Sequence, residues 1–311
     1  MRKTKWICLI ILVCILLLIS CDSDNSLSPP SNVPEDSTYN FAYEDSILMN
    51  SINSFGTTTI HIGSIDGSGI RSLCDSLLSF DGSWSSNKRK ILFIGTLVNS
   101  NYTDLGLYQI DLNNRYRIKR IVPQETRVRN ASYSPDMKYI AYSVSHAANG
   151  IKIRLYNVST EEIIDVTDWL TQPIYGLSWS PDSKNILIDD GYLINIDSTG
   201  MNVLFAFIYG QIFMPVFSPD GSKVAFSGTT AASGWNIYIY DLNTKEKKLL
   251  YPQEHSQYIA SWSKDGNQII FDQRPAGIDA HHYLCKVDID GSNFVQITDT
   301  TDNVWNPSWY K

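Results

Sequence analysis

Short runs of consecutive apolar residues recur along the chain and predict buried β-strands. Because neighbouring positions in each run are apolar, and not only alternate ones, both faces of these strands are expected to be covered. No segment shows a sustained helical period of apolar residues, and we expect at most one helical turn, near Trp169. The runs are Ile91–Ile94, Tyr139–Tyr142, Ile186–Ile188, Val224–Phe226 and Ile269–Phe271.

An aromatic residue followed by a turn sequence precedes each of these runs, and this landmark repeats six times. The landmark aromatics are separated by 49, 46, 38, 45 and 47 residues, a period typical of four-stranded propeller blades. In the Ser-Pro-Asp-Gly turn, proline sets the backbone angle, aspartate bonds its own backbone and glycine takes the left-handed position. The landmark aromatics are Trp84, Tyr133, Trp179, Phe217, Trp262 and Trp309.

The two ends of the repeated region predict a closed ring. The last landmark, Trp309, belongs to a first strand that no further blade follows. At the other end, the second, third and fourth strands of a blade have no first strand before them; they are Ile47–Met49, Thr59–Asp66 and Ile70–Cys74. Joining the two sets completes one blade. The predicted fold is therefore all-β, a six-bladed β-propeller of four-stranded antiparallel blades over residues 41–311, closed by its C-terminal strand.

These turns resemble the WD-repeat-like Ser-Pro-Asp-Gly propeller repeats of TolB-type proteins, which also occur in prolyl oligopeptidase-type peptidases. The resemblance covers residues 41–311; it is clear in the third to sixth repeats and degraded in the second, where Ser85-Ser86-Asn87 stands in the turn. It implies the propeller fold. It implies no peptidase activity, because the chain contains no Gly-Xaa-Ser-Xaa-Gly, His-Glu-Xaa-Xaa-His or phosphate-loop motif.

The N-terminus has the features of a bacterial lipoprotein signal peptide. Arg2, Lys3 and Lys5 precede Trp6–Ile19, an apolar stretch that is too short for a spanning helix and suits a signal-peptide core. Leu18-Ile19-Ser20-Cys21 then resembles a lipobox. The resemblance implies a signal peptide over residues 1–20, cleavage after Ser20 and lipid (diacylglycerol and a fatty acyl chain such as palmitate) on Cys21. An ordinary secretory signal with a coincidental cysteine is the alternative.

Residues 21–40 are polar and rich in proline and serine, so they are expected to form a disordered tether. The predicted location is the cell envelope, lipid-anchored to the outer membrane or to the periplasmic face of the inner membrane. In this oxidising compartment a disulfide between Cys74 and Cys285 is allowed, but these residues fall in different strand positions of neighbouring blades.

The charge balance excludes one class of partner. The chain has a net charge of −7, and without residues 1–20 it has 22 basic and 32 acidic residues, or −10. An acidic body cannot neutralise phosphates, so we expect no nucleic-acid partner. We expect the protein to contact the membrane only through the lipid anchor on Cys21.

No constellation of residues predicts catalysis, a metal site or a cofactor. His255, His281 and His282 fall on loops of the sixth blade and its entrance, and adjacent histidines usually point apart, so we interpret them as solvated loop residues. The aspartates of the turns are interpreted as structural.

The topology places the variable loops on one face of the disc. The loops between second and third strands and the connections between blades meet there, and binding residues tend to sit on such loops. The candidate binding residues on that face are Trp169, Tyr209, His255 and Trp305. The alternative is that these aromatics pack between blades.

The sequence therefore predicts a monomeric, non-catalytic protein-binding or scaffolding module with an envelope protein as its partner. Two alternatives stay open. One is a carbohydrate-active lyase or hydrolase that uses the mouth of the channel. The other is a regulatory propeller whose catalytic partner is a separate chain.

Overall fold

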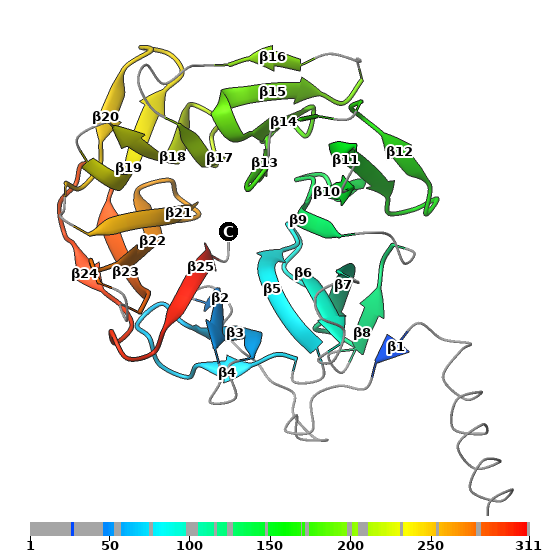
Figure 1. The fold of residues 1–311 in the computed structure, drawn as a ribbon, viewed down its shortest axis with the longest axis horizontal. Helices are drawn as coiled ribbons and strands as arrows, with labels where there is room; N and C mark the ends of the chain where they lie inside the picture. The colour runs from blue at the N-terminus through cyan, green and yellow to red at the C-terminus, as the bar shows by residue number, and fades with distance from the viewer. Residues whose placement is uncertain are drawn as a thin grey trace, which may run out of the picture.

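Six β-sheets surround a central channel in the computed structural model of the chain (Figure 1). The structure describes residues 26–27, 46–52, 57–74, 77–97, 105–114, 117–122, 127–146, 149–168, 170–171, 174–197, 201–204, 211–230, 233–252, 255–277 and 281–309. Within these ranges, no helix has the length and apolar character that crossing a membrane requires.

Each sheet contains a four-stranded antiparallel blade, whose first strand lies at the channel and whose fourth lies at the outside; in the sheet of blade two a short fifth strand pairs with the outer strand. Blade two consists of β5 (Leu77–Trp84), β6 (Lys90–Leu97), β7 (Gly106–Asp111) and β8 (Arg117–Arg120), and blade three of β9 (Val128–Tyr133), β10 (Tyr139–His146), β11 (Gly150–Asn157) and β12 (Ile163–Asp165). Blade four consists of β13 (Leu177–Trp179), β14 (Asn185–Ile188), β15 (Tyr192–Asn195) and β16 (Met201–Val203), and blade five of β17 (Ile212–Phe217), β18 (Lys223–Thr230), β19 (Ser233–Asp241) and β20 (Lys247–Leu249). Blade six consists of β21 (Ser256–Trp262), β22 (Gln268–Arg274), β23 (Tyr283–Asp288) and β24 (Val295–Gln296).

Blade one joins the two ends of the chain, as the sequence predicts. Its inner strand is β25 (Val304–Trp309), which pairs with β2 (Ser46–Ile52); β3 (Thr58–Ser64) and β4 (Arg71–Ser72) complete the sheet. The register sets Trp309 opposite Ile47 and Trp305 opposite Asn50. The six-bladed, four-stranded and C-terminally closed ring is confirmed.

A short strand from the predicted tether lies against the outside of blade two. β1 (Ser26–Leu27) pairs antiparallel with β8, with Ser26 opposite Lys119 and Leu27 opposite Ile118. The rest of residues 21–40, Cys21 and the predicted signal peptide lie outside the described residues.

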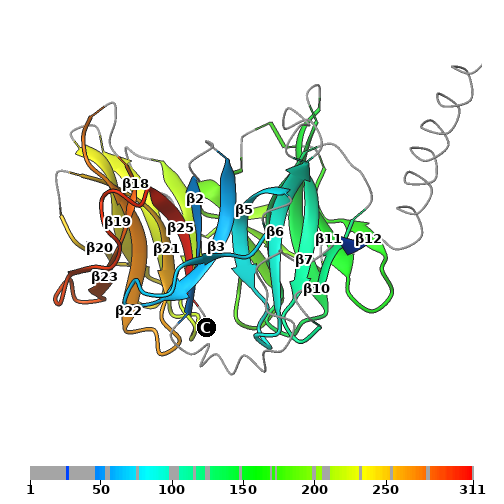
Figure 2. The same ribbon diagram turned by 90° about the horizontal axis from the view of Figure 1, so that it is seen from below.

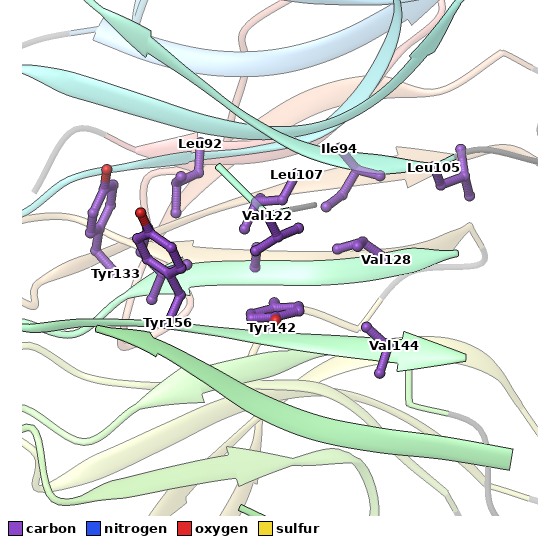
Figure 3. Close-up of a cluster of buried hydrophobic side chains, with 12 residues drawn as sticks. Leu92, Ile94, Leu105, Leu107, Val122, Val128, Tyr133, Tyr142, Val144 and Tyr156 are labelled. Atoms are coloured by element: carbon purple, nitrogen blue, oxygen red, sulfur yellow. The ribbon is translucent and has the colours of Figure 1, made fainter. Parts of the chain in front are cut away.

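The hydrophobic core consists of layers between neighbouring blades, and Figure 2 shows the ribbon of these blades from the side of the disc. Between blades two and three, Leu92, Ile94 and Leu107 face Val128, Tyr142 and Val144 (Figure 3). Five further clusters occupy the other five junctions, the last of them between blades six and one. Both faces of each second strand are therefore covered, which accounts for the consecutive apolar residues in the sequence.

The landmark tryptophans also connect one blade to the next through hydrogen bonds. The indole Nε1 of Trp84 donates to Ser308 O (3.1 Å), that of Trp179 to Ser132 O (3.1 Å) and that of Trp262 to Val216 O (3.2 Å). Each acceptor lies one residue before the landmark of the preceding blade. The landmark thus supplies both apolar area and a fixed register between blades.

The Ser-Xaa-Asp turns are structural, as predicted. In each, the serine hydroxyl donates to the aspartate, as in Ser218 Oγ to Asp220 Oδ1 (2.6 Å), and these hydrogen bonds lower the pKa of Asp220 to about 2. In the degraded second repeat Ser85 Oγ donates to Asn87 Oδ1 (2.9 Å), so asparagine takes the aspartate's place. We call the face that carries these turns the turn face, and the opposite one the crossover face.

Candidate functional site

The channel holds two cavities that meet at the middle of the inner strands. The first, of about 440 Å³, opens toward the turn face, where Pro135, Pro181 and Pro219 line it. The second, of about 410 Å³, lies toward the crossover face, where Arg127 and Ile174 line it. Side chains that line both cavities are those of Asp81, Asn130, Tyr175 and Met214.

A β-bulge in the inner strands creates this meeting point. The pairing of inner and second strands shifts in register between Phe80 and Ser83 and between Phe213 and Val216, among others. Residues at the bulge adopt left-handed backbone angles, with φ of 56° at Asp81 and 49° at Met214. Bulges re-aim side chains, and here they direct polar groups into the channel.

Buried carboxylates in or directly after the second strands accept hydrogen bonds from the backbone of these bulges. Asp189 accepts hydrogen bonds from the backbone N–H groups of Tyr175, of Gly176 (3.2 Å) and of Met214 in the next blade (2.7 Å). Burial raises the pKa of Asp189 to about 6 despite these three donors. Asp272 occupies the equivalent position in blade six and accepts from Asn306 N of blade one (3.4 Å).

Asp81 places a carboxylate inside the channel, where it lines both cavities. Asn306 Nδ2 donates to its Oδ1 (2.6 Å), which links the inner strands of blades one and two. Burial raises the pKa of Asp81 to about 6, while the positive charge of Arg129 opposes the rise. A carboxylate that ionises near neutral pH inside a cavity is a feature of binding and catalytic sites.

The raised pKa of Asp81 predicts that Asp81→Asn stabilises the protein at neutral pH. Because the folded-state pKa of about 6 lies above the ordinary 3.8, the ionised carboxylate destabilises the fold above pH 6, and this cost vanishes below pH 4. We expect the variant to exceed the parent by about 1–2 kcal/mol in free energy of unfolding near pH 7.5, after solvent screening is allowed for. Urea denaturation across pH 4–8 measures the difference.

Asp265→Asn is the matched control for this prediction. The hydrogen bonds of its turn, above all that from Ser263, lower the pKa of Asp265, so removing this carboxylate brings no gain at neutral pH. Equal stability of Asp81→Asn and the parent across the whole pH range would contradict the assignment of Asp81.

An arc of aromatic rings follows the crossover-face mouth of the channel across blades four, five, six and one. Successive ring centroids lie 4.4–6.2 Å apart along the arc. Every ring keeps part of its surface exposed, and Tyr175 is 40% exposed. The members in order are Tyr175, Phe213, Trp235, Tyr258, His282 and Trp305, and we call them the aromatic arc.

The repeat explains the arc. The residue four positions before each landmark aromatic is Phe80, Arg129, Tyr175, Phe213, Tyr258 or Trp305, so five of the six are themselves aromatic. Trp235 and His282 take equivalent places at the start of the third strands of blades five and six. Aligning the six landmarks would have shown this second aromatic position, which our sequence analysis did not identify.

Two arginines lie at the end of the arc that begins with Tyr175. Arg127, which directly precedes β9, and Arg129, which lies on β9, are both exposed and line the second cavity together with Phe80 and Tyr175. Hydroxyls of β10 fix their backbone: Ser143 Oγ donates to Arg129 O (2.6 Å) and Ser145 Oγ donates to Arg127 O (3.3 Å).

Of the four predicted binding residues, the structure places two. Trp305 belongs to the aromatic arc. His255 is half-buried, and its Nδ1 lies 3.2 Å from Tyr283 Oη and 2.9 Å from Gln273 Nε2, so it is tied into blade six. Trp169 and Tyr209 lie outside the described residues.

The interpretation of His282 as a solvated loop residue was wrong. Its Nδ1 lies 2.7 Å from Oδ2 of Asp272, which is fully buried, and only 26% of its side-chain surface is exposed. Burial raises the pKa of Asp272 even though His282 opposes the rise. The sequence could not show this contact, because the partners lie on different strands.

The remaining candidate groups form no cluster of their own. Cys74 and Cys285 are buried and unbridged, and burial raises the pKa of the Cys285 thiol to about 12. Among the residues described by the structure, no three His, Cys, Asp or Glu side chains converge as metal ligands.

Solved structures share this architecture. TolB from Acinetobacter baumannii superimposes with a TM-score of 0.71 at 18% identity, over 90% of this chain and 68% of that one. The fold is a TolB-like six-bladed propeller. A putative TolB from Agrobacterium tumefaciens matches with a TM-score of 0.63 at 18% identity, over 86% of this chain and 98% of its own. No family model matches the sequence.

A propeller of a peptidase gives a weaker match to this TolB-like fold. A puromycin-hydrolysing peptidase from Mycobacterium tuberculosis matches with a TM-score of 0.58 at 13% identity, and the match covers 82% of this chain but only 44% of the peptidase. At these identities the likenesses establish the fold.

Proposed function

We propose that the protein is a lipid-anchored propeller of the bacterial cell envelope that binds a protein partner through its crossover face. The observation that carries the proposal is the rigid ring whose channel mouth presents a continuous arc of partly exposed aromatic rings. Aromatic side chains on a preformed scaffold are common anchors at interfaces because they bury large areas at low entropic cost. The TolB-like fold supports an envelope role.

The lipid anchor is proposed from Cys21 and the residues before it. Two or more acyl chains, at about 0.8 kcal/mol per buried CH₂, hold a protein on a bilayer nearly permanently. We therefore expect Cys21→Ser to move the protein from the membrane fraction to the soluble envelope fraction. Detergent-phase partitioning of cell fractions measures this, with Cys74→Ser as the control that leaves the lipobox intact. Membrane association that survives Cys21→Ser would contradict the anchor.

Proximity labelling from the tethered protein tests the binding role. We expect the parent and Lys264→Gln, an exposed change on the turn face, to label the same partner set. A double variant with Trp305→Ala and Tyr175→Ala removes two rings from the arc and should lose part of that set. Identical labelling by all three proteins would exclude the crossover face as the binding surface.

One observation favours a second candidate, an enzyme that acts on a polysaccharide. Asp272 fixes His282 through Nδ1 at the channel mouth, in the way that a buried carboxylate orients a histidine base. Incubation with envelope polysaccharides, followed by detection of unsaturated products or new reducing ends, tests this candidate. Turnover by the parent that His282→Gln abolishes would replace the binding role by a catalytic one.

A further inference from the structure

We infer that the crossover-face mouth of the channel binds a short saccharide that carries a carboxylate, with its ring against the aromatic arc and its carboxylate on Arg127 and Arg129. The inference goes beyond the proposed protein-binding role and does not depend on it.

The carboxylate subsite rests on the placement of the two guanidinium groups. Arg127 and Arg129 are both exposed, and both line the 410 Å³ cavity. Within the described ranges neither guanidinium forms a hydrogen bond or an ion pair, although the positive charge of Arg129 acts on the carboxyl group of Asp81. Guanidinium groups pair with carboxylates in a bidentate geometry, so the two side chains offer hydrogen-bond donors to a bound carboxylate.

Hydrogen bonds within the protein hold the backbone of this subsite in place without a ligand. The backbone carbonyls of both arginines accept hydrogen bonds from serines of β10, and Nδ2 of Asn130, the residue after Arg129, donates to Ile174 O of blade four (3.0 Å). Asn130 is the residue left unpaired at the β-bulge and has a left-handed φ of 45°, and Arg127, just before β9, has a left-handed φ of 52°. Such preorganisation lowers the entropic cost of binding.

The saccharide part of the inference rests on the neighbouring rings. Tyr175 borders the arginine subsite and stacks on Phe213 at a centroid distance of 4.4 Å, and the arc continues from there to Trp305. A pyranose has an apolar C–H face that packs on aromatic rings and polar hydroxyls at its edge. The cavity meets both needs, because apolar lining residues alternate with a few polar ones, among them Asp81 and Asn130.

The negative net charge of the chain favours a short ligand with few carboxylates over a long polyanion. The chain carries a net charge of −7, so a polyanion would be repelled by the body of the protein although two local cations attract it. A short saccharide with one or a few carboxylates gains the contact with the arginines without this penalty.

Binding of defined saccharides to the full chain, purified in detergent, tests the inference. The acidic probes are sialyllactose and trigalacturonate, and lactose is the neutral counterpart of the first. The readouts are isothermal calorimetry and tryptophan emission, since Trp235 and Trp305 lie in the arc. We expect saturable binding of the acidic probes, about tenfold tighter than that of lactose.

Variants separate the two parts of the site. Arg127→Gln with Arg129→Gln should reduce the affinity for acidic probes about tenfold and leave that for lactose unchanged. Tyr175→Ala, which removes the ring beside the arginines, should weaken both. Lys264→Gln, which removes one positive charge on the turn face, should weaken neither. All of these side chains are partly or fully exposed, and thermal melts verify folding.

Three results would overturn the inference. They are the absence of saturable binding of both acidic probes, acidic binding that the double arginine variant leaves intact, and capture of an acidic aromatic hexapeptide in the same assay without capture of the saccharides. None of these results bears on the proximity-labelling test, so failure of this inference and failure of the proposed function are distinguishable.

Discussion

Deleting residues 304–311 is expected to abolish cooperative unfolding of the propeller. The deletion removes β25, and with it the strand that closes blade one and covers the inner edge of β2. Val304 and Trp309 leave the cluster between blades six and one, and Trp84 Nε1 loses its acceptor at Ser308 O. The loss of buried area and hydrogen bonds exceeds about 5 kcal/mol, comparable to the whole stability of a typical protein. Calorimetry and urea titration measure it.

A permuted chain is the control for this deletion. Moving residues 302–311 to a position just before Ser46, with a flexible linker, supplies the same strand from the other end of the ring. We expect this chain to recover a cooperative transition, because closure requires the strand and not its place in the sequence. A deleted chain that unfolds at the parent's midpoint would show that the ring does not depend on this closure.

Trp262→Ala is expected to destabilise the protein by about 4–7 kcal/mol. Trp262 has no exposed surface and packs in the cluster between blades five and six. Truncating a buried tryptophan costs about 3–5 kcal/mol, and the lost hydrogen bond from its Nε1 to the carbonyl of Val216 adds about 1–2 kcal/mol. The midpoint and slope of urea denaturation measure the effect.

Two further variants separate the causes of this loss. Trp262→Phe keeps much of the ring volume but no N–H donor, so it should cost about 1–3 kcal/mol. Trp305→Ala makes the alanine substitution at a partly exposed ring of the channel mouth and should cost less than half of Trp262→Ala. Equal losses for Trp262→Ala and Trp305→Ala would contradict the assignment of Trp262 to the interior and of Trp305 to the mouth.

Most of the fold could be predicted from the sequence because each blade repeats the same short sequence pattern. The landmark aromatic, the Ser-Xaa-Asp turn and the apolar second strand each act over a few residues, and their spacing indicates the number of blades. The closure of blade one by β25 also follows, since an unpaired first strand and an incomplete first blade each leave exposed edges.

The site was predicted only in part, because it combines residues of several blades. Of the predicted face, Trp305 lies in the aromatic arc, whereas His255 is bonded within blade six. The bulges turn Asp81 and Asn130 toward the channel, and a shift in register of this kind leaves little trace in composition.

Sequence alone determined the repeat and the ring, since these depend on patterns that are local or periodic, whereas lipid on Cys21 stays a prediction. Only the tertiary structure decided that Asp272 holds His282, that Asn306 reaches Asp81 and that six rings line one mouth. The physical reason is that these contacts join side chains far apart in the chain, and their directions depend on bulges and on the packing between blades.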